Sequence, residues 1–253
     1  MIGELITTES VQADGIRRPI SLRGLFGSMM SAGLAAGECL LLAGPAGVGK
    51  ATLALTTCIA VARSGVPASY IITDGPVSVI GELAGRIGAV DRGVFVAALN
   101  DVNSICDGLR ELAVHDGPKL VVIDNLESIS GSIDLISTLQ SLLAAARAGG
   151  AALLVVFGQQ VNIPLGRQRS ILNLVDAVIR MDQDDDRAAR LLSLIKNRRG
   201  PSPQYRALVH HAGGLEDSRR DQLAAEDRGH SIAVMEGHAH RLFCTLLGVD
   251  DGS

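Results

Sequence analysis

The chain has 253 residues, of which 47% are hydrophobic and 20% are charged. This balance is enough to bury the core of one α/β domain, and it excludes an intrinsically disordered protein. The net charge of −4 gives no general attraction to nucleic acid, so any contact with DNA has to come from a local basic patch.

No apolar stretch of the sequence is typical of a membrane span. The longest, residues 139–157, is interrupted by Gln140, Arg147 and a glycine pair, and it predicts a helix, a turn and a buried strand. The first ten residues contain no basic segment followed by an apolar run, so no secretory signal is expected. We therefore expect a cytoplasmic protein that does not bind membranes.

From Glu38 onward, short apolar runs alternate with helical stretches. Strands are predicted at 39–43, 70–73, 94–97, 120–124 and 152–157, with helices at 50–63, 77–87, 102–113 and 133–147. This alternation predicts βαβ units, a mainly parallel sheet between helices, and ligand sites beyond the carboxyl ends of the strands. Further runs at 177–181, 191–195 and 205–209 predict antiparallel strands that extend the sheet.

A glycine-rich loop follows the first predicted strand and opens the first predicted helix. Its residues are Gly44, Pro45, Ala46, Gly47, Val48, Gly49, Lys50, Ala51 and Thr52. Glycines let backbone N–H groups turn toward phosphate oxygens, the helix N-terminus adds positive potential, and Lys50 can reach the β- and γ-phosphates. This context favours a phosphate-binding loop (P-loop) for ATP over an incidental glycine-rich turn.

One position of the loop departs from the usual pattern. Ser or Thr normally follows the lysine and ligates Mg²⁺, whereas this chain has Ala51. The methyl group cannot bind a metal, and Thr52 points about 100° away around the helix, toward an α-phosphate. Loss of this contact is expected to weaken the metal site by about 1.5–3 kcal/mol, although water can replace part of it.

Polar residues follow three of the predicted strands. Asp124 ends an apolar strand in the Walker B arrangement, which places it beside Mg²⁺ through a water. Asp74 either orients the attacking water or forms the turn before Gly75. Gln159, after the strand 152–157, either senses the γ-phosphate or belongs to a plain polar loop.

The cysteines and histidines give no metal-binding pattern. Cys39, Cys58, Cys106 and Cys244 include no Cys-x-x-Cys pair, and we interpret them as ordinary buried side chains. The histidines at 210, 211, 238 and 240 have no carboxylate or cysteine partner at a ligand-like spacing, so we expect no metal site there.

These motifs together resemble the ATPase core of the bacterial RadA (Sms) family of RecA-like P-loop proteins. The similar segments are 44–53, 120–124 and Lys196–Gly200, the last matching a Lys-Asn-Arg-Phe-Gly motif that helicases of the DnaB type share in part. Asp176 within 174–178 adds to the match. The segments 231–237 and 241–243 resemble the opening strands of the Lon-protease-like domain of RadA.

The resemblance implies a RecA-like P-loop NTPase that acts as a homo-hexamer, or in a mixed ring with a RecA/RadA-type protein, around single-stranded DNA. Lys196 and Arg198 would then reach the γ-phosphate of a neighbouring subunit, unless the basic turn is simply solvated. Arg167 and Arg169, expected in the loop after Gln160, and also Arg199, are candidates for contacts to DNA phosphates.

From this resemblance we expect a lead-in over 1–20, the ATPase domain over 21–217, and a linker with a truncated start of the Lon-like domain over 218–253. The family's zinc finger is not seen, Ala51 lacks the metal-binding hydroxyl, and Asp74 and Gly75 replace paired acids. Nucleotide binding should tolerate these changes better than hydrolysis does. Three functions remain open: an ATPase of recombination and repair, a hydrolysis-impaired regulator of a RecA/RadA-type ring, and a KaiC-like signalling ATPase.

Overall fold

A nine-stranded sheet runs through the described part of the chain in the order β3-β2-β4-β5-β1-β6-β7-β8-β9. The computed structural model describes residues 19–22, 24–88, 93–131, 134–158, 165–183, 189–211 and 214–217. Six strands run parallel: β1 (Cys39–Gly44), β2 (Ala68–Ile72), β3 (Val94–Ala98), β4 (Lys119–Asp124), β5 (Ala151–Gly158) and β6 (Ala177–Gln183). The antiparallel strands are β7 (Ala189–Asn197), β8 (Gln204–His211) and β9 (Gly214–Asp217).

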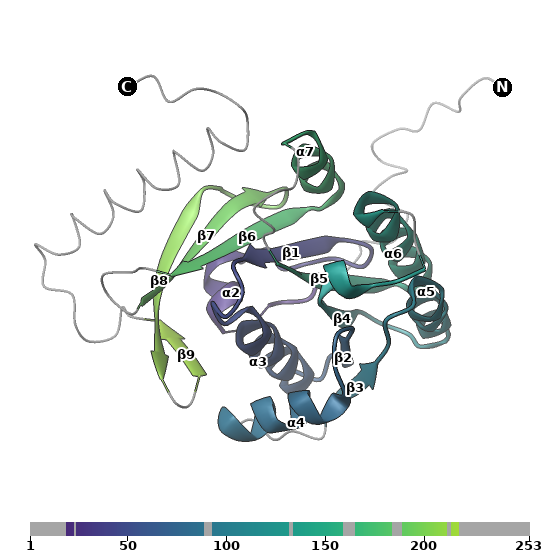
Figure 1. Ribbon diagram of the computed structural model, residues 1–253, viewed down its shortest axis with the longest axis horizontal. Coiled ribbons are helices and arrows are strands. Elements are labelled where there is room, and N and C mark those ends of the chain that lie inside the picture. The colour runs from purple at the N-terminus through teal and green to yellow at the C-terminus, as the bar shows by residue number, and fades with distance from the viewer. Residues whose placement is uncertain are drawn as a thin grey trace, which may run out of the picture.

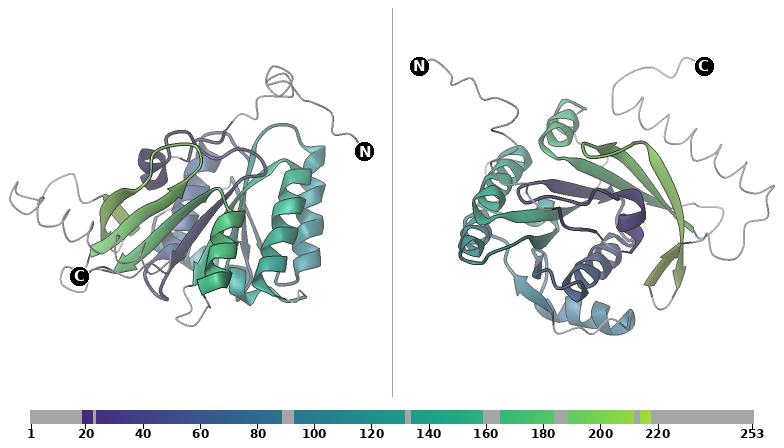
Figure 2. Two further views of the ribbon diagram at one scale, coloured as in Figure 1. Left: turned by 90° about the horizontal axis from the view of Figure 1, so that it is seen from above. Right: turned by 180° about the vertical axis from the view of Figure 1, so that it is seen from behind.

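Helices cover both faces of the parallel strands (Figures 1 and 2). Helices α2 (Leu25–Met29), α3 (Lys50–Arg63) and α4 (Val77–Arg86) contribute to one core cluster. Helices α5 (Val102–Glu111), α6 (Leu135–Gly149) and α7 (Leu165–Leu174) contribute to the other. Two single-turn helices, η1 (Leu112–Val114) and η2 (Leu126–Ser128), lie on either side of β4 in the sequence.

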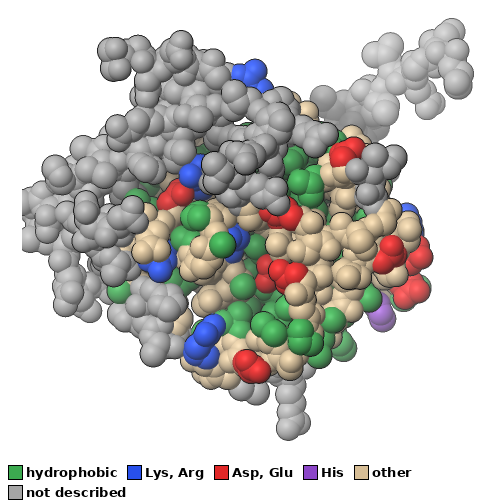
Figure 3. Space-filling view, in the orientation of Figure 1, with side chains coloured by type: hydrophobic (Ala, Val, Ile, Leu, Met, Phe, Trp, Pro, Cys, Tyr) green, Lys and Arg blue, Asp and Glu red, His purple; other side chains and the backbone are tan. Residues whose placement is uncertain are grey.

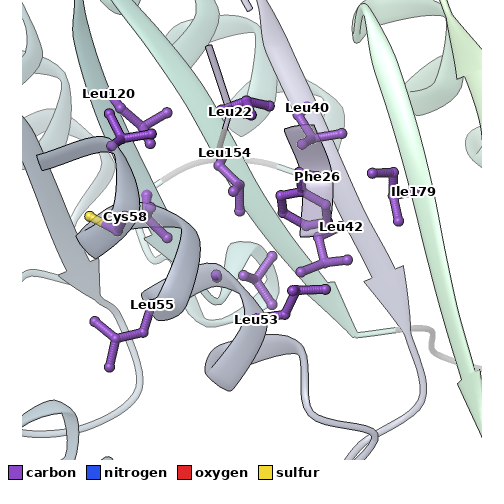
Figure 4. Close-up of a cluster of buried hydrophobic side chains, with 14 of the residues drawn as sticks. Leu22, Phe26, Leu40, Leu42, Leu53, Leu55, Cys58, Leu120, Leu154 and Ile179 are labelled. Carbon is purple, nitrogen blue, oxygen red and sulfur yellow. The ribbon is translucent and has the colours of Figure 1, made fainter. Parts of the chain in front are cut away.

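The two cores follow from the alternation of side chains along each strand. On β1, Leu40 and Leu42 enter the α2–α3–α4 core, whereas Cys39 and Leu41 enter the α5–α6–α7 core. Because both faces are buried, the strands are nearly continuous apolar runs, as parallel strands in α/β proteins are. Figure 4 shows Phe26 of α2 among the leucines of β1 and β5, so the short helix fills the core beside α3.

The predicted α/β architecture is confirmed, with two corrections. The expectation of antiparallel strands from Ala177 onward is wrong for one side of β6, which pairs in parallel with β1 and antiparallel with β7. The expected loop around Arg167 and Arg169 is helix α7, whose Ile171 and the following Val175 are buried against the sheet. Strand β9 was not anticipated, because its four residues are too few to show a pattern.

Both ends of the chain lie outside the described residues. The predicted lead-in is described only for its last two residues, of which Ile20 is 2% exposed, and the predicted segment 218–253 is not described. The domain boundaries therefore stay predictions. Within the described ranges, no helix has the length and apolar character needed to cross a membrane.

Gly149 provides a test of how closely α5 and α6 pack. A Cβ at this position would overlap the carbonyl oxygen of Leu109, so Gly149→Ala should lower the free energy of unfolding by about 1–3 kcal/mol. Gly108→Ala on α5 is the matched control, because its Cβ would meet nothing within 4 Å and should add about 0.5–1 kcal/mol. Urea unfolding followed by circular dichroism measures both, and equal effects would contradict the packing described.

Candidate functional site

The register of the parallel strands brings the predicted site residues to one edge of the sheet. Gly44 at the end of β1 lies beside Gly158 at the end of β5, and Asp124 at the end of β4 lies beside Ile72 of β2. Since β5 pairs with both β4 and β1, the ends of these three strands are neighbours. The P-loop and the Walker B carboxylate therefore open onto the same region.

The P-loop has the backbone conformation that phosphate binding needs. Gly47 and Gly49 have φ values of 75° and 107°, in the left-handed region that glycine tolerates. Gly49 caps α3, so the loop leads directly into the N-terminus of a 14-residue helix. Gly44 is required for a different reason: a Cβ there would overlap the carbonyl oxygen of Met181 on β6. The loop therefore has left-handed glycines and leads into a helix N-terminus, and its role in nucleotide binding stays a prediction.

The side chain of Lys50 folds back onto this loop. Its Nζ donates hydrogen bonds to the carbonyl oxygens of Gly44 at 2.9 Å and Pro45 at 2.8 Å. Partial burial lowers the pKa of this ammonium group, while Glu127 and then Asp124 act in the opposite direction and favour its charged form. The cation is thus held at the loop by weak carbonyl acceptors that phosphate oxygens can replace.

Asp124 is held in place by a neighbouring strand. Its Oδ2 accepts a hydrogen bond of 2.5 Å from the Tyr70 hydroxyl, and Tyr70 on β2 is fully buried. Burial raises the pKa of the Asp124 carboxyl, the Tyr70 hydrogen bond lowers it, and the charge of Asp74 raises it. Thr73 and Asn125 directly follow β2 and β4. The Thr73 hydroxyl donates to the Asn125 carbonyl oxygen at 2.6 Å and accepts from the Asn125 N–H at 2.7 Å. The ends of β2 and β4 are therefore tightly joined beneath the carboxylate.

The remaining predicted residues near the loop have more limited support. Asp74 follows β2, is exposed, and lies close enough to influence Asp124, which leaves both of its predicted roles open. Ala51 occupies the first turn of α3 and packs partly against the core, while Thr52 beside it is only 8% exposed. Gln159 lies outside the described residues.

Two residues that the sequence did not single out also meet at this site. Glu127 lies on η2, three residues after Asp124; burial raises the pKa of its carboxyl, and the backbone N–H of Gly158 lowers it. Arg190, near the start of β7, donates from Nε to the carbonyl oxygen of Val48 in the P-loop at 3.1 Å. Both approach the loop only through the fold. A carboxylate shortly after a Walker B strand was the one available sequence signal.

The oxygen donors at the site suit a divalent cation such as Mg²⁺. Asp124 and Glu127 are both carboxylates near the P-loop, and hard cations prefer carboxylate and water oxygens. The Oε2 atom of Glu127 is buried and, among the described residues, has no hydrogen-bond partner. Elsewhere, Cys39, Cys58 and Cys106 are buried thiols, and the described residues contain no cluster of three or more potential metal ligands.

The basic turn Lys196–Arg199 lies at the opposite edge of the sheet from the P-loop of its own chain. Asn197 at the end of β7 pairs with Ala177, and Ala177 pairs with Leu40 near the start of β1. Lys196 donates to the carbonyl oxygens of Leu172 at 2.6 Å and Val175 at 2.8 Å, at the C-terminal end of α7. The turn is therefore part of the packing around α7 rather than of the local nucleotide site.

The two arginines of this turn form ion pairs within the chain. Arg198 donates to Asp176 Oδ1 at 2.8 Å, and Arg199 Nε donates to both carboxylate oxygens of Glu38 at 2.7 and 2.8 Å. Asp176 also accepts from the Cys39 N–H at 3.0 Å, which fixes the start of β1. These contacts explain the Asp176 and basic-turn signals structurally, and they leave the predicted roles toward ATP and DNA untested.

The candidate DNA residues Arg167 and Arg169 lie in the first half of α7, and Arg169 is exposed. Helix α7 follows β5, so its N-terminal end belongs to the same edge of the sheet as the P-loop. On the described part of the face in Figure 3, basic and acidic side chains are interspersed. The contact of these arginines with DNA stays a prediction.

The fold is that of RecA-like ATPase domains. The solved structure of an ATPase domain superimposes with a TM-score of 0.62 over 82% of this chain and 94% of that chain, at 14% identity. A KaiC-like protein from Pyrococcus horikoshii OT3 gives a TM-score of 0.65 over 80% of this chain and 99% of that chain, at 18% identity. The predicted fold class, including the antiparallel extension, is confirmed.

In sequence, the chain is similar to the DNA repair protein RadA. It is 29% identical over 200 residues to RadA of Mycobacterium tuberculosis (strain CDC 1551 / Oshkosh), which covers 74% of this chain and 41% of the relative. Against RadA of Streptococcus pneumoniae, identity is 24% over 84% of this chain and 53% of the relative. The resemblance noted in the motifs is confirmed, although the chain spans about half or less of these relatives. No family model matches the chain.

The contact between Tyr70 and Asp124 can be tested by its pH dependence. Tyr70→Phe removes a hydrogen bond to a charged, half-buried group and should lower the free energy of unfolding by about 1.5–3 kcal/mol at pH 8. Because the hydroxyl favours the ionised carboxylate, the loss should shrink as the pH falls and Asp124 becomes protonated. Urea unfolding at pH 5 and pH 8, with Asp124→Asn completing a double-mutant cycle, measures this. An identical loss at both pH values would rule out the ionic hydrogen bond.

Proposed function

We propose that this chain binds ATP with Mg²⁺ at the P-loop and acts as a RadA-like ATPase on single-stranded DNA in recombination and repair. The observation that carries the proposal is the joint presence of the cradle Gly44–Lys50 and the Walker B carboxylate Asp124 at one edge of a RecA-like sheet. The sequence similarity to RadA over about three quarters of the chain supports the biological role.

Different residues of the site would contact different parts of a bound triphosphate. The N–H groups of the loop and the N-terminus of α3 face the phosphates, and Lys50 exchanges the Gly44 and Pro45 carbonyls for phosphate oxygens. Asp124, oriented by Tyr70, is the residue that would hold the metal. A bound Mg²⁺ would supply positive charge that offsets the negative charge developing during phosphoryl transfer. Asp74 or Gln159 would orient the attacking water.

The ring proposed for this protein gives the distant basic turn a role. Lys196 and Arg198 lie far from the P-loop of their own chain, so they act on a nucleotide only if it belongs to a neighbouring subunit. A homo-hexamer, or a mixed ring with a RecA/RadA-type partner, provides such a neighbour. Cations placed against the γ-phosphate stabilise the transition state of phosphoryl transfer. Arg167 and Arg169 on α7 would contact DNA phosphates, with Arg199 as a further candidate.

A second function is favoured by the same site. Ala51 offers no hydroxyl to the metal, and Asp74 is one methylene shorter than the expected glutamate. These features suit a nucleotide-binding subunit that hydrolyses ATP slowly and regulates a RecA/RadA-type relative by joining its ring.

Nucleotide binding should depend on Lys50. Lys50→Ala removes the cation at the loop and should abolish binding of ADP and of a non-hydrolysable ATP analogue in isothermal titration calorimetry. Arg110→Ala on the exposed surface of α5 removes an equal charge and should leave the affinity unchanged. Equal affinities for Lys50→Ala and the unsubstituted chain would overturn the P-loop assignment.

Steady-state ATP hydrolysis with and without single-stranded DNA separates the two functions. We expect slow hydrolysis that rises about ten- to hundredfold when Ala51→Ser and Asp74→Glu are combined, because each restores a displaced or missing contact. Lys196→Ala should lower the remaining activity only in the assembled ring.

DNA stimulation that disappears in the Arg167→Ala/Arg169→Ala variant supports the recombination ATPase. Binding of ATP without any response to DNA supports the regulatory subunit. A chain that turns over as fast as a full-length RadA, with no gain from the double substitution, would contradict the roles given to Ala51 and Asp74.

A further inference from the structure

The two carboxylate oxygens of Glu127 have different surroundings: Oε1 lies against the end of β5, and Oε2 lacks a hydrogen-bond partner among the described residues. A Cβ at Gly158 would lie 2.9 Å from the Oε1 of Glu127, so the end of β5 confines this side chain on one side. Its Oε2 is buried and lacks a hydrogen-bond partner among the described residues. A buried carboxylate oxygen without a partner is costly, which calls for a ligand that supplies one.

The charges around Glu127 indicate what kind of ligand this is. Among the carboxylates that act on the Lys50 ammonium group, Glu127 has the largest effect and Asp124 the next. Two half-buried carboxylates thus share the region of one lysine, and burial raises the pKa of each. Lys50 is a cation that acts on both carboxylates, whereas Arg190 donates its Nε to the carbonyl oxygen of Val48. The arrangement favours an added cation rather than an added anion alone.

The neighbouring positions lack the groups that usually supply this contact. Ala51 has no hydroxyl, and one oxygen of Asp124 is already engaged by Tyr70. Glu127 stands on η2, which follows β4 directly, and reaches across to the end of β5 on the side toward the P-loop. It is therefore a carboxylate close to Lys50 in a chain whose Ala51 cannot supply the usual oxygen ligand.

We propose that Glu127 is a second anionic anchor for the divalent cation of a bound nucleotide, acting beside Asp124 and replacing part of the contact absent at Ala51. The inference rests on the proposed nucleotide binding and adds a residue and a chemical role to it. It assigns Glu127 to metal retention rather than to the support of the loop.

The test measures metal and nucleotide affinity separately. Mn²⁺ is titrated by electron paramagnetic resonance into the full chain with ADP or a non-hydrolysable ATP analogue, and calorimetry in EDTA gives the nucleotide affinity without metal. Glu127→Gln keeps the size of the side chain and an acceptor oxygen but loses the charge, so it should bind Mn²⁺ about ten- to hundredfold more weakly. Its metal-free nucleotide affinity should stay equal or rise, because a negative charge near the phosphates is removed.

Controls separate this role from a structural one. Glu111→Gln, an exposed glutamate at the end of α5, should leave both affinities unchanged. Glu127→Asp keeps the charge on a shorter side chain and should lose less Mn²⁺ affinity than Glu127→Gln. Adding Ala51→Ser to Glu127→Gln should restore part of the Mn²⁺ affinity if the two positions serve the same cation.

The outcomes are distinct. A selective loss of Mn²⁺ affinity in Glu127→Gln supports the proposal, and unchanged Mn²⁺ affinity overturns it. A parallel fall of metal-free and metal-dependent affinity also overturns it, because it shows that Glu127 only shapes the loop. If the unsubstituted chain binds no nucleotide at all, it is the proposed function that fails.

Discussion

The parallel pairing of β4, β5 and β1 is the constraint on which the whole site depends. Only this order puts Gly158 between the P-loop and the Walker B strand, so that Glu127 can reach across from η2. A shift of register by one residue would exchange the side chains of each strand between the two helical layers. The buried alternation that fixes the register, seen in Leu40 and Leu42 against Cys39 and Leu41, therefore also fixes the geometry of the site.

The partly buried ionisable groups of the site lower the stability of the folded protein. Burial disfavours the ionised forms of Asp124 and Glu127 and the protonated form of Lys50, and their mutual attraction offsets only part of this. Ionisable groups with shifted pKa values are common at binding sites, because a charged ligand can neutralise charges that are unpaired in its absence. Hydrogen bonds from neighbouring residues hold these groups in place. Thr73 and Asn125 join the ends of two strands, and the buried Tyr70 orients Asp124.

The sequence was most informative where function and local structure share a pattern. The P-loop and Asp124 were predictable because a glycine-rich loop and an apolar strand ending in an acid are contiguous. Glu127 and Arg190 were not, because they join the loop only after β5 and β7 have taken their places in the sheet. Helix α7 has a short apolar face and many polar residues, which made it look like a loop. The basic turn was visible, but the edge of the sheet on which it lies depends on the pairing of β6 and β7.

The contacts of that turn have a mechanical consequence. Lys196 and Arg198 donate to the carbonyl oxygens of Leu172 and Asn173 in the last turn of α7 and of Val175 just after it, where no backbone N–H of the helix can serve as donor. If either cation turned toward another acceptor, those carbonyls would lose their donors and the final turn of α7 would be free to unwind. The direction of the two cations and the stability of the last turn of α7 are therefore linked. The basic turn acts as the C-terminal cap of this ten-residue helix.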